Sequence, residues 1–183
     1  MYYRLVASIT RDHIREHLQD YLDVAEVDLD TNTKLTLPKS FDVASFVGGV
    51  VGITGKGDFP AMAIDAHSKA ASPTTEDLYT QRYDGQITWM VGGDNPKVVE
   101  QQAKGYGAAL EMFITDHRYK PFVDSFDESA LPFSFVEFGF IRSEFFGAAS
   151  VEVEQRGQKR LWVDGGRLEI AWITSERGQG QHE

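Results

Sequence analysis

The amino-acid sequence predicts an α+β fold, in which a mainly antiparallel sheet is packed by two helices and ends in a C-terminal β-meander. Helical spacing of apolar residues over 96–117 and over 3–21 predicts the helices, and alternation near the C-terminus predicts strands. The length of 183 residues suits one domain. We therefore expect a single domain over residues 1–183, with an extended arm and glycine loop at about 24–58 and a flexible tail at 178–183.

The best-defined element is a helix that follows the turn at residues 92–95. The side chain of Asn95 can accept a hydrogen bond from an amide of the first helical turn, and Pro96 lacks an N–H that would have no partner there. Such a helix packs on a sheet or on another helix through one apolar stripe. The stripe has spacings of four and three and consists of Val99, Ala103, Tyr106, Leu110 and Phe113.

Two glycines, Gly105 and Gly107, lie inside this predicted helix, where each costs about 1 kcal/mol relative to alanine. One interpretation is that they let the helix lie close to a neighbouring backbone. The other is that the glycine face contacts a second subunit. Both glycines are therefore candidates for a subunit interface.

The N-terminal segment from Tyr3 to Tyr21 is predicted to be one helix with apolar residues on two faces. An alternative makes Tyr2 to Ile9 a strand and begins the helix after Thr10, which would serve as its N-cap. We favour the single helix. Its two apolar faces imply burial on two sides, or burial on one side and a partner on the other.

An acidic, turn-rich arm from Asp23 to Phe46 follows, and its sparse apolar residues predict an extended excursion across the body or toward a neighbour. The next stretch, Gly48 to Gly57, resembles a phosphate-binding loop only in part. Lys56 follows a glycine, but Val50 stands where the first glycine of that motif belongs, and Gly57 stands where serine or threonine would bind magnesium. We therefore expect a flexible glycine loop without a nucleotide.

Three segments predict strands in the middle of the chain, at residues 60–67, 79–91 and 133–141. Because phenylalanines fall on both faces of the last segment, we expect that strand to be covered on both sides. Its alternation places Phe133 and Phe135 opposite Phe138. The segment therefore predicts a strand whose two faces are both buried.

The C-terminal part predicts an antiparallel meander. Apolar and acidic residues alternate over 151–154, residues 156–158 form a turn, and residues 161–164 form the next strand. The sequence Asp164-Gly165-Gly166 is typical of a tight turn that requires positive φ. We therefore expect the chain to reverse there and to return as a strand over residues 167–173.

Composition excludes several functions. The 28 acidic residues outnumber the 18 basic ones, and the net charge of −10 argues against gripping a DNA duplex. The absence of cysteine excludes disulfides, thiolate zinc sites and a cysteine nucleophile. No apolar run reaches the roughly 18 residues of a membrane helix, and Met1 to Arg4 lack the features of a signal peptide. We expect a soluble protein that is used without export and binds no membrane.

Charge is also distributed unevenly along the chain, with acids dominating residues 121–155 and bases dominating residues 156–177. A solvated surface of mixed sign explains this pattern. The alternative is that the acidic face of one subunit meets the basic hairpin of the next, as in a head-to-tail ring. The interface candidates in this part of the chain are Glu152, Glu154, Arg160, Trp162 and Arg167.

One string, His13-Ile14-Arg15-Glu16-His17, matches the inverted zinc-protease pattern H-x-x-E-H. The two histidines lie one helical turn apart and could share a metal ion, with Glu16 as a base. Such a site needs a third ligand on a separate helix, and no second helix here offers one with any specificity. We therefore interpret the string as a solvent-facing helix of mixed charge.

The other histidines, His67, His117 and His182, are isolated in the sequence. A favourable interaction with a helix dipole is sufficient to explain His117. Paired acids such as Asp28 with Asp30 are expected to be solvated. The sequence thus predicts no catalytic residue, no cofactor and no metal ligand.

The order of elements carries a resemblance. A leading helix, an irregular arm, a proline-led strand at Phe59–Asp65, a Gly-Asp-Asn turn, and a long helix with Tyr106 and Ala108-Ala109-Leu110 precede the late strands. This layout resembles the tail-terminator and neck proteins of long-tailed bacteriophages. The resemblance covers most of the chain. It rests on the order of helices and strands and does not include a signature motif.

The resemblance implies a non-enzymatic virion protein at the tail–neck junction, assembled in the host cytoplasm. It implies a homo-oligomeric ring, typically a hexamer, that caps the tail tube protein and docks the head connector. An acidic ring would let DNA pass without binding it. The alternatives are a phage head-completion or connector protein, and a small α+β enzyme with a site of scattered carboxylates and histidines.

Overall fold

The computed structural model describes residues 2–29, 33–42, 59–74, 78–119, 131–152 and 160–176. Its elements are α1 (Tyr3–Glu26), β1 (Ser40–Asp42), β2 (Ala61–Thr74), β3 (Leu78–Gly93), α2 (Pro96–Asp116), β4 (Phe133–Phe145), β5 (Ala149–Glu152) and β6 (Arg160–Glu176). The strands form one sheet in the order β1-β2-β3-β6-β4, and β5 pairs with β6. Among these described strands, β1 alone runs parallel to its neighbour. The predicted α+β class with a mainly antiparallel sheet is therefore confirmed.

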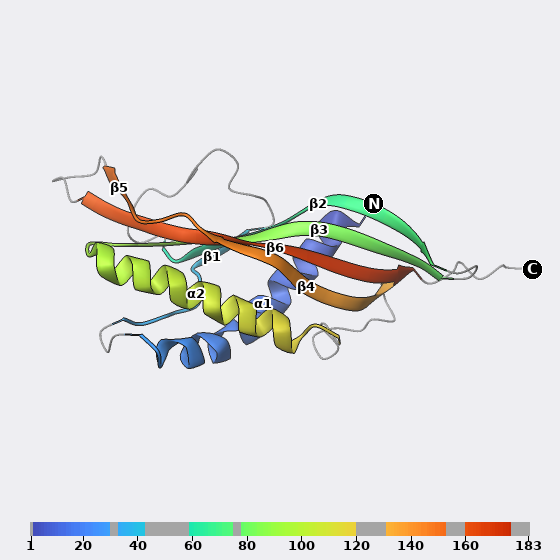
Figure 1. Cartoon of the computed structure of the whole chain (residues 1–183), viewed down its shortest axis with the longest axis horizontal. Coiled ribbons are helices and arrows are strands. Elements are labelled where there is room, and N and C mark those ends of the chain that lie inside the picture. Colours follow the sequence, from blue (N-terminus) through green and yellow to red (C-terminus); the bar gives the residue numbers. More distant parts are fainter. Residues whose placement is uncertain are drawn as a thin grey trace, which may run out of the picture.

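The molecule has two layers, with both helices on one face of the sheet (Figure 1). The helix α1 contacts β2 and α2, whereas α2 contacts β3, β6 and β4. Buried side chains from both helices and from the central strands form one core cluster between the layers. Within the described part of the chain, neither helix is both long and apolar enough to cross a membrane.

The N-terminal segment is one helix, as predicted, and the alternative strand is wrong. It continues to Glu26, past the predicted end at Tyr21. Thr10 therefore lies in the middle of the helix. Its hydroxyl donates to the Val6 carbonyl at 2.8 Å, and the same oxygen accepts from Trp172 Nε1 at 2.9 Å. This contact ties α1 to the sheet.

The helix α2 begins as predicted. Asn95 is its N-cap, and the side-chain oxygen accepts from the Lys97 N–H at 3.0 Å, with Pro96 in the first turn. The whole predicted apolar stripe is buried. The side chain of Trp89 in β3 donates from Nε1 to the Ala103 carbonyl at 2.9 Å, so this helix is also fixed to the sheet by a hydrogen bond.

Residues 33–42 cross the body, which is one of the two predicted courses for the arm. Leu35 is buried beside α2, and the Gln102 side chain donates to the Lys34 carbonyl at 2.9 Å. The backbone then reaches the sheet through a bond from Lys39 N–H to the Pro60 carbonyl at 2.7 Å. The predicted glycine loop lies outside the described residues.

The predicted turn at Asp164-Gly165-Gly166 is wrong, because β6 continues straight through these residues. Gly165 stands opposite Met90 in β3, and a Cβ at Gly165 would lie 2.1 Å from the Trp89 carbonyl oxygen. A glycine is thus required here because two strands approach each other closely, and the chain does not reverse at this point. The other predicted turn of the meander, at residues 156–158, lies outside the described residues, and the strands on either side of it, β5 and β6, pair antiparallel.

The strand β4 is not covered on both sides. It lies at the end of the strand order, and a register shift between Phe135 and Glu137 interrupts its alternation. The shift places Phe138 in the same core cluster as Phe133 and Phe135. Val136, at the shift, is 46% exposed. The aromatic residues therefore indicate one buried face on an edge strand.

Candidate functional site

Three histidines from two helices come together where the end of α2 packs on α1. His13 and His17 lie one turn apart on α1, and His117 is the C-cap residue of α2. The ring centre of His13 lies 4.5 Å from that of His17 and 4.7 Å from that of His117, and the His17 and His117 centres are 6.1 Å apart. We call these three residues the histidine cluster.

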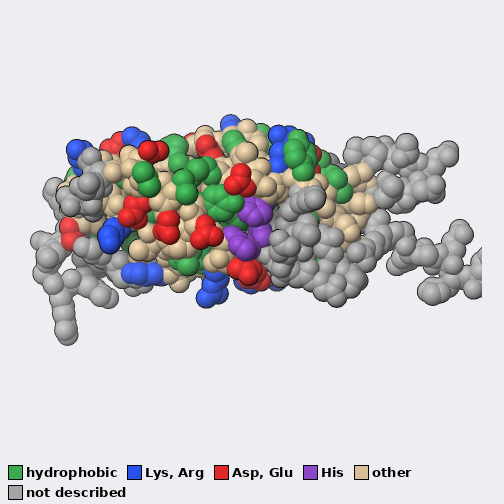
Figure 2. All heavy atoms as spheres, turned by 90° about the horizontal axis from the view of Figure 1, so that it is seen from below, with side chains coloured by type: hydrophobic (Ala, Val, Ile, Leu, Met, Phe, Trp, Pro, Cys, Tyr) green, Lys and Arg blue, Asp and Glu red, His purple; other side chains and the backbone are tan. Residues whose placement is uncertain are grey.

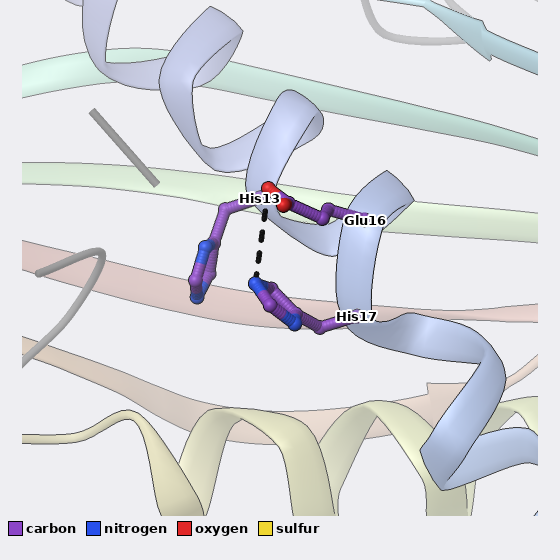
Figure 3. Close-up of side chains that lie close together, drawn as sticks. All are labelled: His13, Glu16 and His17. Atoms are coloured by element: carbon purple, nitrogen blue, oxygen red, sulfur yellow. Dashed lines mark ion pairs between the residues drawn. The ribbon is translucent and has the colours of Figure 1, made fainter. Parts of the chain in front are cut away.

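Glu16 adds a carboxylate to this cluster. Its Oε2 lies 3.8 Å from His17 Nε2, and the donor atoms of His13, Glu16 and His17 all lie within 4.8 Å of one another. Figure 3 shows the two imidazole rings beside each other, with a dashed line joining the Glu16 carboxylate to His17. His13 is only 3% exposed, whereas the side chains of His17 and Glu16 are 33% and 61% exposed. The group is closed on one side and open to solvent on the other.

Aromatic packing and one hydrogen bond fix His117. Its ring stacks on Phe113 with centres 4.4 Å apart, and its Nδ1 lies 2.8 Å from the Phe113 carbonyl oxygen. A carbonyl only accepts, so Nδ1 carries the proton and donates. The tautomer that results leaves Nε2 with a free lone pair.

Tyr21 closes one flank of the cluster, with its ring centre 6.1 Å from that of His117. Burial and a hydrogen bond with Asp116 raise the pKa of Tyr21 to about 12, so the phenol keeps its proton. The acidic side chains that surround the histidines at the surface of the helical layer are visible in Figure 2. A cation would therefore meet a favourable potential here.

His13 resists protonation. Burial, followed by the nearby His117 and His17 rings, lowers its pKa from 6.5 to about 3. The imidazole is consequently neutral at pH 7, which is the form that binds metals.

Acid is expected to destabilise the protein through His13. The unfolded chain binds a proton at this residue below pH 6.5, but the folded chain excludes it until about pH 3, so stability falls as the pH is lowered through this window. Guanidinium titrations at pH 7.5 and 5.0, with EDTA, measure the difference. In a His13→Gln variant the difference in stability between the two pH values should be smaller. In a variant of the exposed His67, His67→Gln, that difference should be as large as in the wild type. If both variants reduced the pH dependence of stability equally, His13 would not be its source.

The expectation that no second helix supplies a further ligand stays a prediction, although α2 does bring the ring of His117 next to His13 of the H-x-x-E-H string. The interpretation of that string as solvent-facing is wrong for His13, which is buried. One signal was available: His117 follows Phe113 by four residues and extends the apolar stripe of α2. Likewise, His13 and His17 follow Thr10 at spacings of three and seven on the packed face of α1.

A second candidate site is the exposed edge of β4. Large apolar side chains are concentrated there, each between 40% and 52% exposed. They are Val136, Phe140, Ile141, Phe145 and Phe146, which we call the β4 surface. A hollow of about 420 Å³ opens beside Phe140 and Ile141, toward Arg118 at the end of α2. Apolar clusters of this kind mark contact surfaces.

The predicted interface glycines face the interior of this chain. A Cβ at Gly105 would lie 2.8 Å from Leu35 Cδ1, and one at Gly107 would lie 2.8 Å from Phe145 Cζ. These contacts explain both glycines within a single chain. Their role between subunits stays a prediction.

The charged interface candidates are dispersed. Arg167 forms an ion pair with Glu144 across β6 and β4, so this part of the acidic and basic runs is paired within one chain. Trp162 is partly buried against the core. Glu152 and Arg160 stand opposite each other in the ladder of β5 and β6, and Glu154 lies outside the described residues. No single surface joins all the predicted interface residues that the structure describes.

Known proteins give no direct guide to these two sites. No family model matches the chain, and no curated protein matches its sequence. The geometry of the histidine cluster and of the β4 surface therefore carries the functional inference.

Proposed function

We propose that this chain is a structural subunit that assembles head to tail into a ring, with β4 of one copy against β2 of the next. The observation that carries the proposal is that, among the strands that the structure describes, the two edges of the sheet are largely unpaired. No described strand pairs with the outer edge of β4. At the other end, β1 covers only Ala61 to Ala63 of β2. Two different edges that pair make a heterologous contact, and such contacts close into rings.

The composition of the β4 edge supports a protein partner. A long edge strand that is meant to stay solvated is usually protected by charges or proline. The charges of β4, which are Glu137, Arg142 and Glu144, are each paired within the chain. Ile141 and Phe140 stand among them and are 52% and 40% exposed. Burying such side chains stabilises a contact by about 25 cal/mol per Å² of apolar surface. The hollow beside them offers space for side chains of the second copy.

The specific role we propose is that of a phage tail terminator. The ring, typically a hexamer, would cap the tail tube protein and face the head connector at the tail–neck junction of the virion. The order of helices and strands agrees with the layout that suggested this role. The net charge of −10 would keep DNA from adhering as it passes through the ring. No bond is made or broken in this role.

Analytical ultracentrifugation and negative-stain images of the full chain at high concentration test the proposal. We expect a discrete ring in equilibrium with monomer, and an Ile141→Glu variant that stays monomeric because the glutamate places a charge in the contact. Val27→Glu is the matched control, since Val27 is 82% exposed at the end of α1 and should not affect assembly. A wild-type chain that stays monomeric, alone and with isolated tail tubes, would contradict the proposal.

A further inference from the structure

The histidine cluster has the dimensions of a metal site. A tetrahedral zinc ion with Zn–N distances of about 2.0–2.1 Å holds the centres of two ligating imidazole rings about 5 Å apart. The ring centres of His13 lie 4.5 Å from His17 and 4.7 Å from His117, and the third separation is 6.1 Å. The two separations that involve His13 are therefore close to the spacing that one ion would impose, and the separation of His17 from His117 is about 1 Å longer.

A fourth donor is present. The donor atoms of His13, Glu16 and His17 lie within 4.8 Å of one another, whereas donor atoms on one tetrahedral ion are about 3.3 Å apart. Closing this gap needs only rotations of His17 and Glu16, which are partly exposed and free to turn. Ligands at these positions of one helix are common in zinc sites because they project from the same face.

Protonation and orientation also suit a metal. The Phe113 carbonyl accepts from His117 Nδ1, which orients that ring as a second ligand shell usually does and leaves Nε2 to bind. The His13 ring is buried and lies beside the rings of both other histidines, so it is the central member of the cluster. Surrounding acids favour a cation over an anion.

From this convergence we infer that His13, His17 and His117, with Glu16, bind one divalent transition-metal ion, for which Zn²⁺ is the reference. Imidazole nitrogen favours zinc and its neighbours in the first transition series over magnesium or calcium. Three imidazoles and one carboxylate would complete a four-coordinate tetrahedral shell, which is the coordination number and geometry that structural zinc takes. The ion would link α1 to the end of α2 and stabilise the helical layer. The inference does not depend on ring assembly.

The test is calorimetric titration of the EDTA-treated full chain with ZnCl₂ at pH 7.5. We expect one zinc ion per chain, a rise in Tm with zinc, and no binding of Mg²⁺. His17→Gln should weaken zinc binding by more than about 100-fold, because loss of a ligand costs more than loss of an outer-shell partner. His117→Gln should weaken it by at least about 10-fold. Both residues are partly exposed, so neither variant should unfold the chain.

His67→Gln is the matched control, because His67 is an exposed histidine in the sheet and should not change the affinity. Co²⁺ provides a second readout: a tetrahedral visible spectrum in the wild type should disappear in His17→Gln and persist in His67→Gln. Absence of saturable zinc binding would overturn the inference. So would His117→Gln binding zinc as tightly as the wild type, or Mg²⁺ binding comparably. None of these three results would bear on the proposed assembly into a ring.

Discussion

Gly165→Ala is expected to lower the free energy of unfolding by about 3 kcal/mol, although the change adds one methyl group. The new Cβ would lie 2.1 Å from the Trp89 carbonyl oxygen and 3.1 Å from Met90 Cα, both of which are backbone atoms of β3. Flexible side chains can move aside, but a backbone in the middle of a sheet cannot move without breaking its ladder. The two central strands must separate, and guanidinium unfolding followed by fluorescence measures the loss.

Gly139→Ala is the matched control. Gly139 also lies within a strand, β4, and its Cβ would have no neighbouring atom within 4 Å. An alanine there removes freedom from the unfolded chain and should leave stability unchanged or raise it by about 0.5 kcal/mol. If the two variants were equally stable, β3 and β6 would not approach each other as closely as described.

The Gly165 position shows why part of the fold could not be predicted from sequence. An Asp-Gly-Gly sequence suits a tight turn, and it suits a strand against which another backbone packs closely. The choice depends on the β3 backbone at Trp89 and Met90, which only the pairing of β3 with β6 brings next to Gly165. In contrast, the cap of α2 depends on Asn95 and Pro96 alone, so local chemistry predicted it correctly.

The histidine cluster was missed for a related reason. The H-x-x-E-H string supplies two ligands by helical spacing, but the third comes from α2, and only the packing of α2 on α1 brings it near. The prediction that both faces of β4 are covered was also wrong, because a register shift places Phe138 on the same buried face as Phe133 and Phe135. Local patterns therefore predicted the helices and the sheet class, whereas the contacts that form the candidate sites depend on tertiary packing.

Trp172→Ala is expected to lower the free energy of unfolding by about 3–5 kcal/mol, since it removes a large, fully buried ring. The indole stacks on Phe138 with ring centres 5.9 Å apart, and its Nε1 donates to the Thr10 hydroxyl at 2.9 Å. Loss of this side chain leaves a cavity between the sheet and α1 and removes a polar bond between the two layers. Trp162→Ala removes the same side chain from a partly exposed position of the same strand and should cost much less.

The hydrogen bond can be separated from the packing. Trp172→Phe keeps most of the ring but loses the donor, and it should cost roughly 1–2 kcal/mol. Thr10→Val removes the acceptor and leaves the Trp172 N–H buried, at a cost of about 1–3 kcal/mol. Because the two changes affect one bond, the double variant should be more stable than the sum of the single losses implies. Strict additivity would show that Thr10 and Trp172 do not interact, and that α1 is held to the sheet by apolar packing alone.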